Sequence, residues 1–193
     1  MTVKEFKLSF FISFALVTAL SVFSLAAEAR NITENVFRLH VRAADNSAVA
    51  QKIKVDVRDA LLECASEITA KCENSTQTKN AISDSIETIE KAANDVLEKN
   101  NCGYTAKAYI AKERFPTKTY ENISLPAGKY EALVVELGDA KGENWWCMLY
   151  PRLCSGKADD GQITDAVGDE TAKVLADREC YRFKILEIIG TIF

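Results

Sequence analysis

An uncharged run of 20 residues, from Leu8 to Ala27, follows two lysines at the N-terminus. A basic start, an apolar stretch and small residues up to Ala29 are typical of a secretory signal. A run of this length also suffices to cross a bilayer as a helix, so the segment is either cleaved or kept as an uncleaved anchor. We therefore predict a signal segment at 1–29 and a domain at 30–193 that lies outside the cytoplasmic membrane.

The domain that remains is long enough for one hydrophobic core and gives little reason to divide it in two. The chain carries a net charge of −4 and has no basic run. A nucleic-acid partner is therefore not expected, because such a partner needs a cluster of cations. For the same reason, contact with a membrane is expected only through the signal segment.

The first half of the domain combines one strand with two helices. Residues 37–42 alternate between apolar and charged side chains, which predicts a strand with one face on a core. Asp45, Asn46 and Ser47 offer helix-capping oxygens before a stripe of apolar residues at three- or four-residue steps. A second stripe, which ends before Asn100, predicts another helix. The two stripes are Ile53, Val57, Leu61, Cys64 and Ile68, and then Ile82, Ile86, Ile89, Ala93 and Val96.

The second half changes to strand periodicity. Four segments rich in aromatic and β-branched residues predict strands at 104–111, 130–137, 145–150 and 181–189. The segment at 130–137 is apolar on both faces and is expected to be central. A third, shorter helix is expected around Ile163 and Leu175. The predicted fold class is α+β, a single domain with a mainly antiparallel or mixed sheet of about five strands, on which two long helices and one shorter helix pack.

All six cysteines lie in the exported part of the chain, where disulfides are expected. Cys147 and Cys154 are a plausible pair, and closing their loop would stabilise the fold by about 2.5 kcal/mol. Cys64 and Cys72 are also close in sequence, but Cys64 lies on an apolar helix face and is expected to be a small buried apolar group. The pairing itself stays open at this stage.

The most specific stretch of the chain runs from Lys112 to Cys154 and holds both tryptophans. Specific motifs occur in this stretch and on either side of it: Phe37-Arg38-Leu39-His40-Val41, Lys54-Val55-Asp56-Val57-Arg58-Asp59-Ala60, Arg114-Phe115-Pro116-Thr117-Lys118-Thr119-Tyr120, Leu125-Pro126-Ala127-Gly128-Lys129-Tyr130-Glu131-Ala132-Leu133, Gly142-Glu143-Asn144-Trp145-Trp146-Cys147 with Cys154, and Arg182-Phe183-Lys184-Ile185-Leu186-Glu187. In this order, the motifs resemble those of the stage II sporulation protein R family of endospore-forming bacteria.

The resemblance implies a signalling protein that is made in the forespore and exported to the space between the forespore and the mother cell. In the family the partner is a membrane-embedded aspartic protease of the mother cell, which processes the inactive precursor of a sigma factor. The chain would then be a ligand and activator of this receptor protease, and it would need no cofactor and no small-molecule substrate.

The tryptophans are the sharpest candidates for partner contact. Consecutive residues of a strand point to opposite faces, so at most one of Trp145 and Trp146 is expected fully in the core and the other at the surface. An exposed tryptophan is a frequent anchor for a protein partner, whereas the alternative is that both pack as rigid core. The predicted contact residues are Trp145, Trp146, Arg114, Phe115, Tyr120, Arg38 and His40.

Two other function classes remain as alternatives. His40 is the only histidine, so Ser-His or Cys-His catalysis by an extracytoplasmic enzyme would have to use it, with Arg38 beside it. No nucleophile is evident from the sequence, and no metal site is expected, because the cysteine spacings do not match those of zinc sites. The other alternative is a structural module of the cell envelope.

Overall fold

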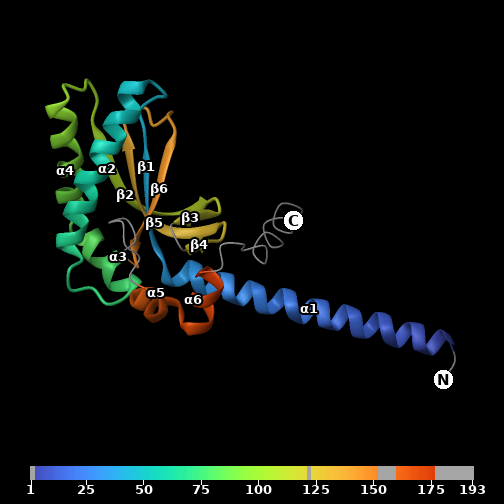
Figure 1. Cartoon of the computed structure of the whole chain (residues 1–193). Coiled ribbons are helices and arrows are strands. Elements are labelled where there is room, and N and C mark those ends of the chain that lie inside the picture. The colour runs from blue at the N-terminus through green and yellow to red at the C-terminus, as the bar shows by residue number, and fades with distance from the viewer. Residues whose placement is uncertain (1–2, 121–122, 152–159, 177–193) are drawn as a thin grey trace.

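The computed structural model describes residues 3–120, 123–151 and 160–176. Figure 1 shows a sheet with helices packed along one side, a small hairpin on the other side, and one long helix that extends away from the domain. The helices are α1 (Val3–Asn35), α2 (Ala48–Ile68), α3 (Ser75–Asp84), α4 (Ile86–Lys99), α5 (Asp160–Val167) and α6 (Asp169–Ala176). The strands are β1 (Phe37–Arg42), β2 (Ala106–Phe115), β3 (Lys118–Tyr120), β4 (Ile123–Leu125), β5 (Gly128–Leu137) and β6 (Asn144–Tyr150).

The main sheet has four strands in the order β2-β5-β1-β6. β1 runs parallel to β5, whereas β2 and β6 are antiparallel to their neighbours, so the sheet is mixed. β5 lies between β2 and β1, and its residues from Ala132 to Val135 are buried on both faces. This confirms the predicted central strand and the α+β fold class. Within the described residues, β3 and β4 pair with each other and form a separate hairpin.

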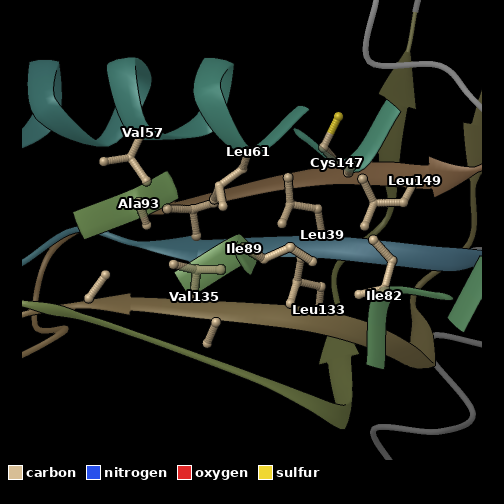
Figure 2. Close-up of a cluster of buried hydrophobic side chains, with 14 of the residues drawn as sticks. Leu39, Val57, Leu61, Ile82, Ile89, Ala93, Leu133, Val135, Cys147 and Leu149 are labelled. Atoms are coloured by element: carbon tan, nitrogen blue, oxygen red, sulfur yellow. The ribbon is translucent and has the colours of Figure 1, made fainter. Parts of the chain in front are cut away.

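The first core lies between the sheet and α2, α3 and α4. Ser47 caps α2, because its side chain accepts a hydrogen bond from the Ala50 N–H, as the sequence predicted. Figure 2 shows apolar side chains from the helices and the strands pointing toward one another. The buried members labelled there are Leu39, Val57, Leu61, Ile82, Ile89, Ala93, Leu133, Val135, Cys147 and Leu149.

The second core lies on the opposite face of the sheet, which we call the second face. The hairpin β3–β4, the end of α1 and the helices α5 and α6 cover part of this face. The buried residues there include Ile32, Val36, Phe115, Ile123, Leu125, Tyr130, Val134, Met148, Ile163 and Leu175. The helices α2, α3 and α4 therefore cover the first face of the sheet, whereas the short hairpin, the end of α1 and two short helices cover part of the second face.

α1 is one continuous helix that connects the apolar run with the domain. Its outer part is exposed, with 66% of Phe11 accessible, whereas Ile32 at its inner end is fully buried. Among the described residues, it is the one helix long and apolar enough to cross a membrane, by length and composition alone. The predicted boundary at residue 29 falls inside this helix. The helix fits a signal segment, and neither cleavage nor anchoring follows from it.

Some predicted elements differ in detail from the structure. The predicted second helix is two helices, because Ser85 leaves the helical conformation and lets Ile82 and Ile89 reach the same core. The predicted third helix is also divided, at Gly168, whose φ of +83° favours glycine. The described part of the main sheet has four strands instead of about five, and the predicted strand at 181–189 lies outside the described residues.

Candidate functional site

Strand alternation places the charged residues of β1 on the second face. Phe37, Leu39 and Val41 belong to the first core, so the side chains between them point the other way. The register then sets Arg38 and His40 beside Met148 and Trp146 of β6. The second face therefore carries cations and an imidazole where a buried sheet face usually carries apolar groups.

Arg38 is fully buried and ties the hairpin to the sheet. Its Nε donates to the Cys147 carbonyl oxygen over 2.9 Å, and its Nη2 donates to the Tyr120 hydroxyl over 2.6 Å. The guanidinium carbon lies 4.4 Å from the Phe115 ring centroid and 5.0 Å from that of Tyr130. Burial lowers the pKa of Arg38. Its Nη1 has no hydrogen-bond partner among the described residues, so aromatic faces supply much of its stabilisation.

His40 is held on both sides of its ring and is only 4% exposed. Its Nδ1 lies 2.5 Å from Oε2 of Glu113, and its Nε2 lies 2.8 Å from Oδ1 of Asn144. The imidazole also stacks on Trp146 at a centroid distance of 5.7 Å. Neither nitrogen bonds a serine, threonine or cysteine of the described residues. In the part of the chain that the structure describes, the two ring nitrogens are therefore occupied by Glu113 and Asn144.

Arg42 extends this network across the sheet. Its Nη2 lies 2.6 Å from Oε1 of Glu113 and its Nη1 lies 2.7 Å from Oε1 of Glu136, and Tyr109 donates its hydroxyl to the same Glu136 oxygen. These groups are partly buried, so their charges are less screened by water than surface ion pairs are. The side chains of β1, β2 and β5 are thereby fixed relative to one another.

An open pocket of about 600 Å³ lies over this network, and we call it the His40 pocket. Its lining is mainly polar, and the loop between β5 and β6 forms part of it. The residues that line it are His40, Arg42, Glu113, Arg114, Ala140, Gly142, Asn144 and Trp146. An aromatic wall with charged neighbours suits a polar or charged group of a partner better than an apolar ligand.

The two tryptophans lie on opposite faces, as predicted, but neither is freely exposed. Trp145 packs against the first core and Trp146 against the second. A cation covers each ring: the guanidinium of Arg58 lies 4.4 Å from the Trp145 centroid, and the ammonium of Lys118 lies 4.9 Å from the Trp146 centroid. The expectation of one exposed tryptophan was therefore wrong, because long basic side chains lie over both rings.

The predicted contact residues fall into three groups. Trp146, His40 and Arg114 line the His40 pocket. Arg38, Phe115 and Tyr120 form the packing beneath the hairpin, where Arg38 and Phe115 have no exposed surface. Trp145 lies on the other face. The seven residues therefore do not form one contact surface, and their role in binding stays a prediction.

Sequence reasoning missed four members of the network, Arg42, Glu113, Glu136 and Asn144. The partners of Glu113 lie 73 and 71 residues away in sequence, at His40 and Arg42. Only the alternation of charged and apolar residues along β1 signalled that Arg38, His40 and Arg42 share a face. Within the described residues, no three histidine, cysteine, aspartate or glutamate side chains are placed to hold a metal ion.

The structure describes four of the six cysteines and so tests the predicted disulfides only in part. Cys64, Cys72 and Cys102 are free thiols, and burial raises the pKa of Cys64, which packs against the first core as an apolar group would. Cys147 is buried in the middle of β6, beside Leu39 of β1, but Cys154 lies outside the described residues. The Cys147–Cys154 pairing therefore stays a prediction.

Alkaline pH is expected to destabilise the domain. Burial raises the pKa of Tyr120 and of Tyr130, and raises that of Tyr104 to about 12. A raised phenol pKa means that the folded state disfavours phenolate. The contribution of these tyrosines to the free energy of unfolding is therefore complete below about pH 10, and it is lost as the pH rises above that value. Urea midpoints at pH 8 and pH 11 measure the loss. Tyr130→Phe is expected to reduce it, and an equal loss in that variant would assign the effect to other groups.

Comparisons with known proteins place this chain in a family. Residues 33–160 match the family model described as stage II sporulation protein R. The chain is 33% identical over 155 residues to the stage II sporulation protein R of Bacillus subtilis (strain 168), an alignment that covers 76% of this chain and 68% of that protein. No solved structure matches the chain at a significant level. On the matched length and this identity, the chain belongs to the stage II sporulation protein R family.

Proposed function

We propose that this chain is an exported sporulation signal that activates a membrane-embedded aspartic protease. The protease of the mother cell would then process the inactive precursor of a mother-cell sigma factor. Family membership is the observation that carries this proposal, and the apolar helix α1 supports export, because it fits a signal segment. The chain acts as a ligand in the space between forespore and mother cell, and the receptor supplies the catalytic groups.

We place the receptor contact at the His40 pocket. Arg114, Asn144 and Trp146 come from family-like motifs far apart in sequence and meet there. His40 holds part of the wall of the pocket in place, since it forms hydrogen bonds with Glu113 and Asn144 and stacks on Trp146. A preformed site of this kind loses little conformational entropy on binding. We include in the proposal a disulfide between Cys147 and Cys154. This disulfide would restrain β6 next to Trp146, which lines the His40 pocket.

The proposal predicts that Trp146→Ala strongly reduces receptor activation. The full chain is co-expressed with the receptor protease and the sigma-factor precursor in a non-sporulating host, and cleavage is followed by immunoblot. Removal of an aromatic anchor typically weakens a contact by about 2 kcal/mol or more, which is roughly thirtyfold in affinity. Cleavage is therefore expected with the parent chain and nearly absent with this variant.

Trp145→Ala is the matched control, because this tryptophan lies on the opposite face of the same strand. It is expected to retain cleavage when its exported amount equals that of the parent. Cleavage that fails in both variants would point to folding, and equal cleavage in both would remove Trp146 from the contact. If the parent chain produced no cleavage although every component was present and exported, the activator proposal would be wrong.

A further inference from the structure

Among the described strands, β2 lies at an edge of the sheet, and side chains of α4 bond to its first half. The Ala106 N–H donates to Oδ1 of Asn94 over 2.8 Å, and Nδ2 of Asn94 donates back to the Ala106 carbonyl. The Ala108 N–H donates to Oε2 of Glu90 over 2.8 Å. Side chains of α4 thus replace the missing neighbour strand for these two residues.

The second half of β2 lacks such partners. In an antiparallel strand every second residue turns both its N–H and its C=O to the same side, so Ile110, Lys112 and Arg114 face outward like Ala106 and Ala108. None of these three residues has a backbone hydrogen bond to another described residue on that side. An edge of this kind is a template for an added strand.

The open half of the edge is also basic. Lys112 and Arg114 of β2 and Lys129 of the adjacent β5 are exposed, and none forms an ion pair with a described residue. The acidic residues nearby are engaged elsewhere, since Glu113 binds Arg42 and Glu131 binds Lys79. A chain with a net charge of −4 therefore gathers three cations, unpaired among the described residues, at this half of the edge.

We propose that residues 110–115 bind an extended acidic segment of a partner protein, which adds to the sheet as a strand beside β2. Backbone hydrogen bonds would supply affinity, and the three cations would select acidic side chains. A second copy of this chain suits the edge poorly, because two β2 edges would bring like charges together. This inference goes beyond the proposed receptor contact and does not depend on it: the two surfaces share Arg114, but the added strand would pair with the backbone of residues 110–115, whereas the His40 pocket lies on the second face.

The test uses the full chain in mild detergent and a synthetic eight-residue peptide of alternating valine and glutamate, with a valine–lysine peptide as its matched control. Fluorescence anisotropy measures binding, and hydrogen–deuterium exchange locates it. The acidic peptide is expected to slow exchange of the amides at 110, 112 and 114 and to bind at least about tenfold more tightly than the lysine peptide. The Ala106 and Ala108 amides, already bonded to α4, should change little.

Two variants separate backbone pairing from charge. Lys112→Pro removes an outward N–H without removing a hydrogen bond to β5, whereas Lys112→Ala removes only the charge. The proline variant is expected to bind the acidic peptide about tenfold more weakly than the alanine variant. If it does not fold, the double variant Arg114→Glu/Lys129→Glu should abolish the preference for the acidic peptide.

Several outcomes would overturn the proposal. They are unchanged exchange at 110–114 with the acidic peptide at about 1 mM, equal affinity for the two peptides, or protection confined to another part of the chain. A stable dimer whose exchange is slowed at this same edge would replace the acidic partner with a second copy.

Discussion

Gly142→Ala is expected to destabilise the domain by about 3 kcal/mol. A Cβ atom at this position would lie 2.2 Å from the Asp45 carbonyl oxygen and 2.8 Å from the Cβ of Ala43. The backbone has little freedom to relax, because the Gly142 N–H donates to the Ala43 carbonyl and the Lys141 N–H donates to that of Ala44. Urea denaturation of the full chain, followed by circular dichroism in mild detergent, measures the change.

Gly103→Ala provides the matched control for this change. A Cβ atom at Gly103 would meet nothing within 4 Å, so the substitution is expected to change stability by less than about 0.5 kcal/mol. If the two variants lost similar amounts of stability, the close approach of residues 43–45 to Gly142 would not be the cause of the destabilisation. Because Asn144 lies two residues beyond Gly142, the Gly142→Ala substitution should also perturb the His40 pocket.

Arg38→Ala is expected to have the other large effect, a loss of about 3–5 kcal/mol, as for other large buried side chains. The substitution removes a fully buried side chain that contacts the Phe115 and Tyr130 rings, and it leaves a cavity between the sheet and the hairpin. It also removes the donor to the Tyr120 hydroxyl. The hairpin should therefore loosen first, and proteolysis between β3 and β4 detects this directly.

Arg38→Met separates volume from charge. Methionine fills a similar space and adapts its shape, and it removes a charge whose burial is unfavourable. The variant loses two hydrogen bonds worth about 1 kcal/mol each, so its net loss should be about 1–2 kcal/mol. A loss as large as that of Arg38→Ala would show that the guanidinium, through its hydrogen bonds and aromatic contacts, matters more than its volume.

The elements that the sequence predicted best are those whose burial repeats along the chain. β1 begins and ends at the predicted residues, and β5 is central because both of its faces are apolar. The hairpin β3–β4 escaped prediction as a pair of strands, since three residues per strand are too few to show a period. The helix breaks at Ser85 and Gly168 also carry no periodic signal, because the apolar stripe continues across each of them.

The candidate site was harder to predict because distance in sequence hides its contacts. Arg38 and His40 were singled out, yet their charged and aromatic neighbours come from β2, β5, β6 and the hairpin. Glu113 looked like one of many surface acids until the register placed it against Arg42 and His40. Likewise, the cations over Trp145 and Trp146 come from other elements, so strand geometry alone could not reveal that both rings are covered.

The continuity of α1 has a mechanical consequence. The helix passes from its exposed apolar stretch to Ile32 without a break, and Asn31 also donates a hydrogen bond to the Val167 carbonyl. In any molecule that keeps this helix in a bilayer, no flexible linker lets the domain reorient, and its height above the lipid is fixed. Such a molecule would search for its partner by lateral diffusion, always presenting the same side, whereas a cleaved molecule would tumble freely.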